Sequence, residues 1–411
     1  TCARGRPMIE LSAIEEARRT IRDHILETPL VYSPTLSERF DAHIHLKLEN
    51  VQKTGSFKVR GATYKIITGQ RQGLISSRGV VAASAGNHAQ GVALAARQAG
   101  LPATIVMPEW ASISKQEATR SYGGQVVICG ATVEECVAEA KSIAEQGAAF
   151  IHPFDDRDII TGQATAGLEI ISALPDADAV LVPVGGGGLI AGVASSVKAL
   201  NPRTRIIGVE AAVCPSAQAA LRAGKCISVP SGGTSIADGI NVKQVGWEPL
   251  QIMRALVDDV VSVQEEDIAA SIQLLLERKR ILSEGAGAVP LAALLSGVFR
   301  PKKGERIVLL ISGGNVDSPL LGRIIQRGLL KHGRIVRLHL TLSDKPGNLA
   351  RLLSKIATLQ ANILHIHHDR SPSICSIDET IVELELETRN HEHIDYITDA
   401  LRVAGYNLTA G

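Results

Sequence analysis

Between residues 79 and 312, short apolar, often β-branched runs alternate with longer stretches in which apolar residues recur at helical spacing. Helices are expected between the runs, for example Asn87–Gln98 and Leu189–Leu200. Strands that alternate with helices are typical of an α/β fold with mostly parallel sheets. The six expected strands are GVVAAS (79–84), ATIVM (103–107), QVVIC (125–129), AVLVPV (179–184), RIIGVEA (205–211) and RIVLLIS (306–312).

A different pattern begins after Lys331. Its strands alternate apolar and polar residues, and its helices are amphipathic, so the order reads βαββαβ, a ferredoxin-like domain. The sequence therefore divides into residues 1–330 and residues 331–411. The expected elements of the second part are RIVRLHLTL, LARLLSKIATLQ, ANILHIHH, ETIVELELE, HEHIDYITDALRVAG and YNLTA.

Charge and composition restrict the class of partner. The chain of 411 residues has 43 basic and 42 acidic residues without long runs, so no nucleic-acid or polybasic membrane surface is expected. No apolar run reaches the length of a membrane span, and the first seven residues are given no function. Small molecules are therefore the expected partners. The six cysteines include no close metal or redox pair, which suits reduced thiols in a cytoplasmic protein: Cys2, Cys129, Cys136, Cys214, Cys226 and Cys375.

Ligand sites in such sheets lie where strands end and helices begin, which directs attention to three loops. These are SAGNHAQG (84–91), PVGGGG (183–188) and ISGGNVD (311–317). The first loop opens a helix, so its N–H groups and the helix dipole favour an anion. Helix capping alone by Asn87 and His88 is the alternative for this loop.

Four consecutive glycines, Gly185–Gly188, follow a strand and open a helix, so backbone N–H groups can converge on a phosphate. A tight turn would need fewer of them. The loop also fits a loose dinucleotide fingerprint, Gly186-x-Gly188-x-x-Ala191, with Glu210 as a ribose ligand, so NAD binding is an open alternative. Its position in the middle of the chain argues against that reading. The Gly-Lys signature of an ATP-binding P-loop is absent from this loop.

The stretch TGSFKVRGA (54–62) places Lys58 just inside an expected helix start. A solvated surface lysine would be the ordinary interpretation. At such a position, however, the helix dipole and any burial favour the neutral amine, which can act as a nucleophile or a base.

Taken together, TGSFKVRGA, SAGNHAQG, GGGGL and SGGN resemble, in this order, the fold-type-II (tryptophan synthase β-like) pyridoxal-phosphate enzymes. The resemblance covers about residues 9–330 and is strongest to the serine/threonine dehydratase family, in particular to threonine ammonia-lyases. SDKPGN after the first strand of the tail resembles an ACT domain, an amino-acid-sensing module. The resemblance implies a catalytic region (1–330), in which a smaller mobile subdomain of about 53–150 closes on a larger one, and a regulatory domain (331–411).

By position, the resemblance implies that Lys58 is the lysine that binds the cofactor covalently and acts as base. Phe57 matches the aromatic residue that packs on the cofactor ring. Asn87 matches the residue at its phenolic oxygen, and Ser312 the partner of its pyridine nitrogen. The phosphate-binding loop matches Gly185, Gly186, Gly187, Gly188 and Leu189.

The same resemblance implies a substrate-carboxylate loop at Ser84, Asn87 and His88. The proposed catalytic set is Lys58, Ser84 and Ser312. Weaker matches to segments that line the site are Asp238, Gly239 and Glu284.

Two positions depart from related patterns. Serine racemases of this family carry a second acid/base serine where this chain has Ala85, so elimination is favoured over racemisation. The cation site of the family is only partly recognisable, since Glu210 is present but Cys214 stands at another of its positions. A monovalent or divalent cation near Glu210 therefore stays an open possibility.

The implied reaction is the α,β-elimination that converts L-threonine, and also L-serine, to a keto acid and ammonia. A branched-chain amino acid is the expected effector, which connects the reaction to isoleucine biosynthesis, and a homodimer or homotetramer is expected. The alternatives are a serine dehydratase or racemase, an NAD-binding oxidoreductase and a non-catalytic amino-acid sensor.

Histidines in HIHHD (365–369) and HEH (391–393) are interpreted as solvated or cross-strand residues, not as metal ligands. The effector residues would be Asp344, Pro346, Gly347 and Asn348.

Overall fold

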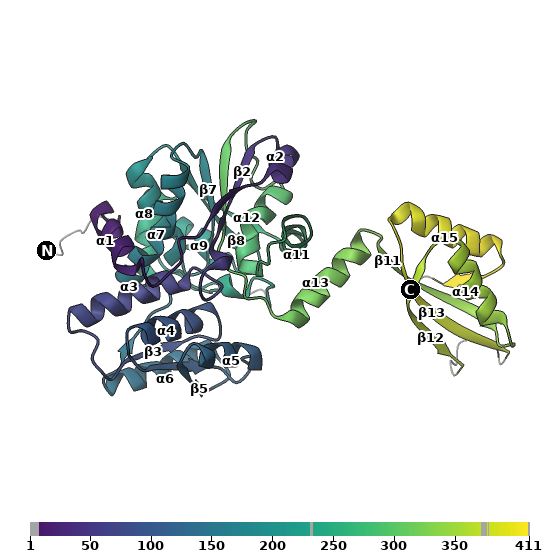
Figure 1. Ribbon diagram of the computed structural model, residues 1–411, viewed down its shortest axis with the longest axis horizontal. Helices are drawn as coiled ribbons and strands as arrows, with labels where there is room; N and C mark the ends of the chain where they lie inside the picture. Colours follow the sequence, from purple (N-terminus) through teal and green to yellow (C-terminus); the bar gives the residue numbers. More distant parts are fainter. Residues whose placement is uncertain (1–7, 231–232, 371–375, 377, 410–411) are drawn as a thin grey trace. The chain divides into compact units, whose positions relative to one another are not determined.

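The computed structural model describes residues 8–230, 233–370, 376 and 378–409, so Cys2 and Cys375 lie outside the described residues. Two compact units make up the chain, Thr1–Asp317 and Ser318–Gly411 (Figure 1). The boundary falls before helix α13 (Ser318–Lys331), whereas the sequence prediction places it after that helix. Helix α13 contacts the first strand of the second unit.

A six-stranded sheet forms the centre of the first unit, in the order β1-β2-β10-β7-β8-β9. Strand β1 is antiparallel to β2, and the other neighbours are parallel. The strands are β1 (Leu30–Tyr32), β2 (His43–Leu48), β7 (Ala179–Pro183), β8 (Arg205–Ala211), β9 (Asp259–Val263) and β10 (Arg306–Ile311).

Helices cover both faces of this sheet, with α7 and α8 on one face and α11 and α12 on the other (Figure 1). The helices of this part are α1 (Leu11–Ile21), α2 (Pro34–Phe40), α7 (Arg157–Ala173), α8 (Gly188–Leu200), α9 (Ser216–Ala223), α10 (Trp247–Leu256), α11 (Glu265–Leu274) and α12 (Gly285–Leu295). Three shorter turns are η1 (Glu49–Val51), η2 (Asp238–Ile240) and η3 (Leu275–Lys279).

A second, four-stranded parallel sheet, β5-β4-β3-β6, lies within the same unit. Apolar residues of α3 and α4 pack on one face, and Cys136 and Ala140 of α6 pack on the other. Its elements are α3 (Lys58–Arg71), β3 (Val80–Ala83), α4 (Asn87–Gln98), β4 (Ala103–Met107), α5 (Ile113–Ser121), β5 (Gly124–Ile128), α6 (Val133–Glu145) and β6 (Ala149–Phe150).

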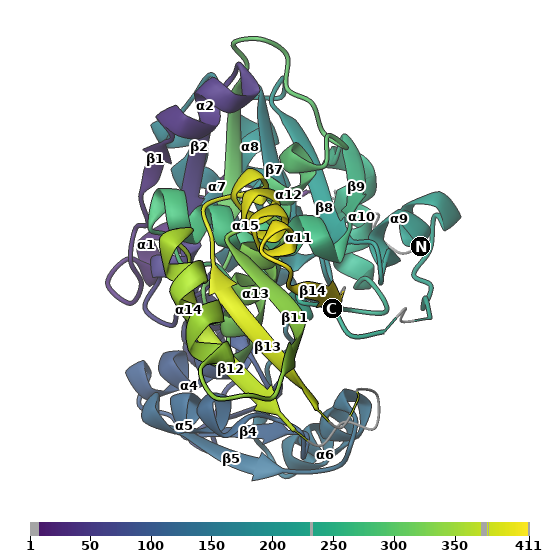
Figure 2. The same cartoon turned by 90° about the vertical axis from the view of Figure 1, so that its right-hand side faces the viewer.

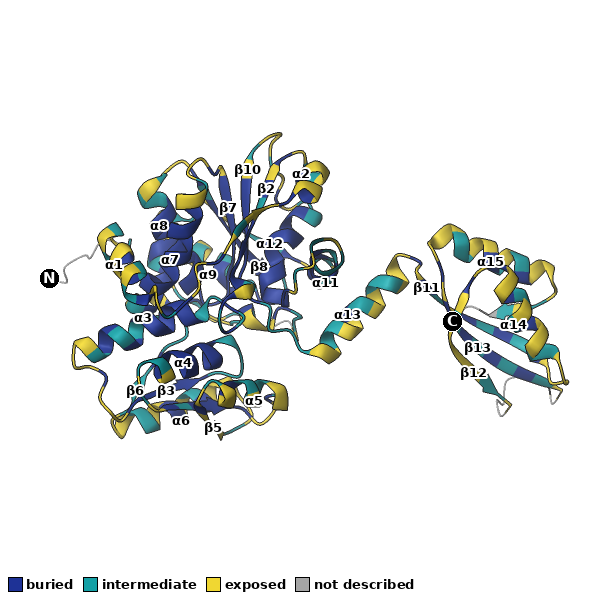
Figure 3. Cartoon of the chain, in the orientation of Figure 1, coloured by how far each residue is buried: buried dark blue, intermediate teal, exposed yellow. Residues whose placement is uncertain are grey.

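The apolar runs of the sequence become the buried strands, as Figure 3 shows for the centre of the large sheet. Every residue of β7 is buried, and its side chains pack with those of α8 in one core cluster. A strand covered on both faces needs apolar residues at every position, which explains its unbroken run. All six strands predicted between residues 79 and 312 are confirmed, and so are the two named helices. Among the helices of the described residues, none combines the length and the apolar composition that crossing a bilayer requires.

The second unit contains the predicted βαββαβ series after α13, with the sheet order β12-β13-β11-β14 and antiparallel pairing (Figure 2). Leu352 and Ile356 of α14 and Ile397 and Leu401 of α15 are buried against the sheet. This is the ferredoxin-like arrangement that the alternating pattern predicts. The elements are β11 (Ile335–Ser343), α14 (Asn348–Thr358), β12 (Asn362–Asp369), β13 (Glu379–Glu387), α15 (His391–Val403) and β14 (Asn407–Thr409).

Candidate active site

A cavity of about 600 Å³ opens in the first unit, where all three loops singled out in the sequence meet the start of α3. All the predicted catalytic, cofactor-binding and substrate-binding residues line it, whereas Glu210, the predicted cation ligand, does not. The sequence therefore identifies the residues that the fold gathers from distant positions. Those that line the cavity are Phe57, Lys58, Ser84, Asn87, His88, Gly185, Gly186, Gly187, Gly188, Leu189, Asp238, Gly239, Glu284 and Ser312.

Lys58 is the first residue of α3, and its side chain lies in the cavity. The Nζ atom donates a hydrogen bond of 2.8 Å to the carbonyl of Pro153 and lies 5.3 Å from the centre of the Phe57 ring. Removal from water lowers the pKa of Lys58 to about 8, while the nearby Glu284 opposes this shift. Lys58 is therefore not the solvated lysine of the ordinary interpretation, and its amine is available in neutral form near physiological pH.

The lowered pKa predicts a distinctive reactivity for Lys58. Because only the neutral amine is a nucleophile, acylation of Lys58 by acetic anhydride, in protein freed of any bound ligand, should rise with pH and reach its midpoint near pH 8. Lys65, on the same helix, is the internal control. Burial acts to lower its pKa, but hydrogen bonds and charges of Asp156 and Asp158 outweigh this and raise it. Peptide mass spectrometry of both lysines across pH checks the prediction, and equal midpoints above 10 would contradict it.

The glycine loop follows β7 and leads into α8. Gly187 is the N-cap residue with φ of +91°, a left-handed conformation that disfavours any side chain. A methyl group on Gly186 would overlap the ring of Phe154, and one on Gly185 would lie 2.9 Å from Cα of Ile240. Close packing thus explains part of the glycine content. On the cavity side, the first turn of α8 presents backbone N–H groups that have no partner within the helix, as anion binding requires.

The loop after β3 ends in α4, whose N-cap residue is Gly86 without a side-chain cap. Asn87 instead donates from Nδ2 to Oε1 of Glu284 at 2.7 Å. The Nε2 atom of His88 lies 2.9 Å from the carbonyl of Ile151, and burial lowers its pKa to about 3, so the ring is neutral and donates there. Side-chain capping by Asn87 or His88, the alternative interpretation, does not occur. Any anion at this helix would therefore meet backbone N–H groups, not the His88 ring.

Glu284 lies between Asn87 and the end of β10, and its side chain is almost fully buried. Burial raises its pKa to about 8, and the negative charge of Asp238 adds to the effect. The carboxyl group is thus largely protonated at neutral pH. A neutral Glu284 leaves the cavity less negative than its residue types suggest, which favours anionic ligands.

Several cavity residues were missed by the sequence reasoning, and three of them make contacts that shape the site. Asn315 donates from Nδ2 to Oδ1 of Asn87 at 2.7 Å, and it could have been found because it ends the SGGN motif. Lys115 of α5 forms a 2.9 Å ion pair with Asp238 of η2 and so connects segments on the two sides of the cavity. Phe154 packs on the glycine loop. Neither Lys115 nor Phe154 lies in a motif that marks it.

Glu210 is buried near the start of α9 and lies outside the cavity lining. Its carboxylate accepts hydrogen bonds from the backbone N–H groups of Ala217 at 2.8 Å and Gln218 at 3.2 Å. Burial nevertheless raises its pKa to about 7. Within the described residues, no group of three or more His, Cys, Asp or Glu side chains is arranged to hold a metal ion. A cation at Glu210 stays a prediction, and a ribose ligand beside the glycine loop is not supported.

The second unit has a cavity of its own, of about 300 Å³, at the loop between β11 and α14. The four predicted effector residues, Asp344, Pro346, Gly347 and Asn348, all line it. Arg370 pairs with Asp344 across this cavity at 3.0 Å. This cavity is therefore lined by one acidic and one basic side chain that are paired with each other.

Comparison with known sequences gives two findings. A family model described as pyridoxal-phosphate dependent enzyme matches residues 21–313. The L-threonine ammonia-lyase of Thermotoga maritima is 46% identical over 402 residues, which are 98% of this chain and 99% of that protein.

Solved structures are also similar. The processed form of threonine deaminase isoform 2 from Solanum lycopersicum has a TM-score of 0.74 and 38% identity, over 78% of this chain and 87% of that one. Maize serine racemase has a TM-score of 0.73 and 35% identity, over 79% of this chain and 99% of that one. The likenesses thus include both a lyase and a racemase.

Proposed function

Because the chain belongs to the family of pyridoxal-phosphate dependent enzymes, we propose that it is a threonine ammonia-lyase that converts L-threonine to 2-oxobutanoate and ammonia. The observation that carries the proposal is 46% identity to an enzyme of that name over nearly the whole of both chains. The cavity supports it, since a part-buried amine of lowered pKa lines the same cavity as a helix N-terminus suited to phosphate. An NAD-binding oxidoreductase would leave Lys58 without a role.

The residues of the cavity fit pyridoxal 5'-phosphate. We assign its covalent link to Lys58 and its phosphate to Gly185–Gly188 with Leu189 at the start of α8. Phe57 would support the ring, and Asn87 and Ser312 would contact its polar atoms. A Cβ on Gly86 would project into open space, so the loop on this side leaves room for a ligand. When bound, the cofactor supplies an electron sink for the charge left at Cα.

Each side chain then has a definite task. The neutral amine of Lys58 removes the Cα proton, because a base with a pKa near 8 is neutral often enough at physiological pH to accept it. The backbone N–H groups at the start of α4, with Ser84, hold the substrate carboxylate. Ser312 offers a hydroxyl, not a carboxylate, to the ring nitrogen, so it adds no negative charge there. Asp238 would contribute to the substrate side from η2.

Ala85 distinguishes elimination from racemisation. Ala85 lines the cavity, and its methyl side chain cannot return a proton to the substrate Cα from the face opposite Lys58. We expect the protein to form little D-serine from L-serine, and Ala85→Ser to increase D-serine formation at least tenfold as a share of turnover. Chiral chromatography of the products measures both rates. Ala85→Gly is the matched control, because it changes the side chain without adding a hydroxyl. Equal D-serine from all three proteins would contradict this role of Ala85.

We further propose that a branched-chain amino acid, isoleucine or valine, regulates the enzyme through the cavity at Asp344–Asn348. The Arg370–Asp344 pair supports this, since these charges complement the carboxylate and ammonium groups of an amino acid.

A homodimer or homotetramer is proposed from the apolar side chains of Leu364 and Ile366, which are exposed on the edge strand β12.

A direct assay tests the proposal. The purified protein should absorb visible light owing to its lysine-bound cofactor, and should release keto acid and ammonia from L-threonine without a reductant. The same assay with L-serine, and with isoleucine or valine added, tests the second substrate and the effector. A colourless protein that binds NAD would refute the proposed function.

A further inference from the structure

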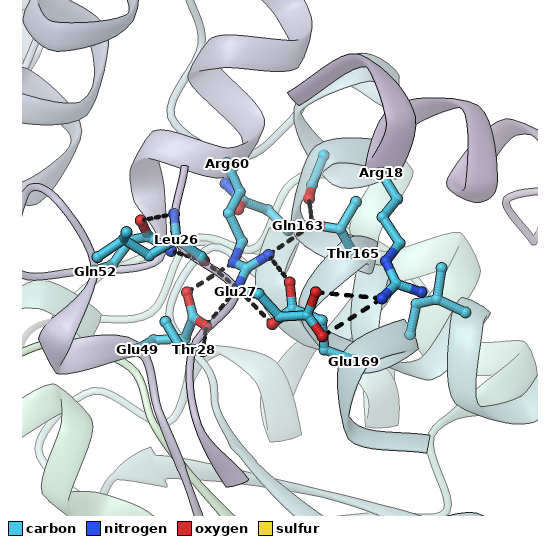
Figure 4. A network of polar contacts seen from close by, with 12 residues as sticks. Arg18, Leu26, Glu27, Thr28, Glu49, Gln52, Arg60, Gln163, Thr165 and Glu169 are labelled. Carbon is cyan, nitrogen blue, oxygen red and sulfur yellow. Dashed lines mark hydrogen bonds and ion pairs between the residues drawn. The ribbon is translucent and has the colours of Figure 1, made fainter. Parts of the chain in front are cut away.

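A network of buried charges lies beside α3 (Figure 4). None of its charged residues lines the cavity. Its centre is Arg60, whose side chain is fully buried. The guanidinium donates two hydrogen bonds of 2.8 Å to Glu49, and two more to Glu169 at 2.6 and 2.8 Å. It also donates to Oγ1 of Thr165 at 3.1 Å. Lys47 completes the network with a 2.5 Å ion pair to Glu169.

The four charges, Arg60, Lys47, Glu49 and Glu169, balance one another. All four side chains are at most 5% exposed. Burial acts to raise the pKa of Glu49, but the charge and hydrogen bonds of Arg60, together with the charge of Lys47, hold it below its usual range. Buried ion pairs of this kind contribute little stability compared with apolar residues of similar volume. Their presence therefore calls for a reason other than stability.

The geometry of α3 gives that reason. Residues two positions apart on an α-helix point in directions about 200° apart, so Arg60 and Lys58 extend from opposite sides of the first turn. Lys58 extends into the cavity, while Arg60 extends toward β2, η1 and α7. The Arg60 guanidinium thus holds the first turn of α3 through six hydrogen bonds, the sixth of which goes to the carbonyl of Leu26 at 3.4 Å.

The network also joins the elements that carry the rest of the site. Lys47 lies on β2, which pairs with β10 up to the residue before Ser312. Glu169 and Thr165 lie on α7. This helix packs closely on α8: a methyl group added to Gly192 of α8 would lie only 2.6 Å from the carbonyl of Ile160 on α7. Helix α8 begins at the glycine loop. One set of hydrogen bonds thereby fixes the Lys58 turn relative to both Ser312 and the glycine loop.

We propose that the Arg60 network, defined as Arg60, Glu49, Glu169 and Lys47, positions the Lys58 amine for proton transfer. This inference rests on the proposed function for its kinetic readout. Arg60 is a positioning residue, because it acts through α3 and touches neither substrate nor cofactor. A displacement of the first turn by a fraction of an ångström would move Nζ away from the line along which it accepts the proton.

Arg60→Lys tests the proposal, because it keeps the positive charge and removes the paired geometry of the guanidinium. In the cofactor-loaded full-length protein, we expect kcat for L-threonine to fall at least tenfold, with KM changed less than threefold. The kinetic isotope effect with threonine deuterated at Cα should increase, because proton removal becomes slower than the other steps. The pH midpoint of the visible absorbance should also shift, a readout that does not depend on turnover.

Arg205→Lys is the matched control. Arg205 also contacts a glutamate through two hydrogen bonds, of 3.1 and 3.0 Å to Glu305, but it lies at the start of β8, away from the carboxyl ends that form the site. Its substitution should leave kcat, the isotope effect and the absorbance midpoint unchanged. The contrast separates positioning of Lys58 from a general effect of replacing an arginine that is paired with a glutamate.

If Arg60→Lys yields no folded protein, Thr165→Val tests the proposal instead, because it removes one hydrogen-bond partner of Arg60 and keeps every charge. Thr165→Ser, which retains the hydroxyl, should behave like the wild type, while Thr165→Val should share the raised isotope effect. If Arg60→Lys or its substitute matches the wild type in isotope effect and absorbance midpoint, the proposal is overturned. A wild type that binds the cofactor at Lys58 but leaves threonine unchanged would refute the proposed function instead, and the absorbance midpoint would still test the network.

Discussion

Replacement of Lys58 by alanine is expected to lower threonine turnover by more than about 10³-fold, the upper range for loss of a general base and a covalent tether together. Lys58 provides the amine of lowered pKa in the cavity, and its Nζ is held by the Pro153 carbonyl. The same variant should lose the covalent link to the cofactor. Borohydride reduction followed by peptide mapping should therefore find the pyridoxyl group on Lys58 of the wild type and on no residue of the variant.

Lys65→Ala is the control for this experiment. It makes the same change on the same helix, where Lys65 pairs with Asp156 and Asp158 at 2.9 and 3.0 Å and does not line the cavity. Its turnover should stay within about twofold of the wild type, because a partly exposed ion pair contributes little. Turnover by Lys58→Ala at a tenth of the wild-type rate would mean that another group removes the Cα proton.

Lys58 could be singled out from the sequence because it lies in a motif, and the strands could be predicted because they are buried. A parallel strand such as β7 is covered on both faces and therefore shows an unbroken apolar run. Strand β2 was not predicted, although the alternation of HIHLKL is typical of a strand with one face in water. Lys47 is nevertheless buried, because Glu169, which is 122 residues away, supplies its countercharge.

Long-range pairing also explains what the sequence could not reveal about the site. Arg60 lies within the TGSFKVRGA motif, but from sequence alone an arginine is expected at the surface. Its burial depends on Glu49 and Glu169, which come from other elements and are not marked by the motif. Phe154 lies in no motif, although its ring determines which residues fit in the glycine loop. Motifs identify residues that contact a ligand, whereas the residues that hold them in place become visible only in the fold.

Gly186→Ala is expected to weaken binding of pyridoxal phosphate by about 10- to 100-fold. The added methyl group would overlap the ring of Phe154, so either the ring or the loop must move. Overpacking of this kind costs about 1–3 kcal/mol, and about 1.4 kcal/mol corresponds to a tenfold change in affinity. Titration of cofactor-free protein, followed by visible absorbance, measures the change. Gly322→Ala is the control, because a methyl group there meets open space.

A second substitution shows whether Phe154 transmits the effect. If the loop is displaced by contact with the ring, removal of the ring in Gly186→Ala/Phe154→Ala should restore part of the lost affinity, so the two changes will not be additive. If a methyl group instead blocks the phosphate directly, the double variant should bind at least as weakly as Gly186→Ala alone. The first result would mean that Gly186 serves the cofactor through packing, with Phe154 holding the N–H groups of α8 in place. Unchanged affinity in Gly186→Ala itself would contradict both mechanisms and remove the glycine loop from the phosphate site.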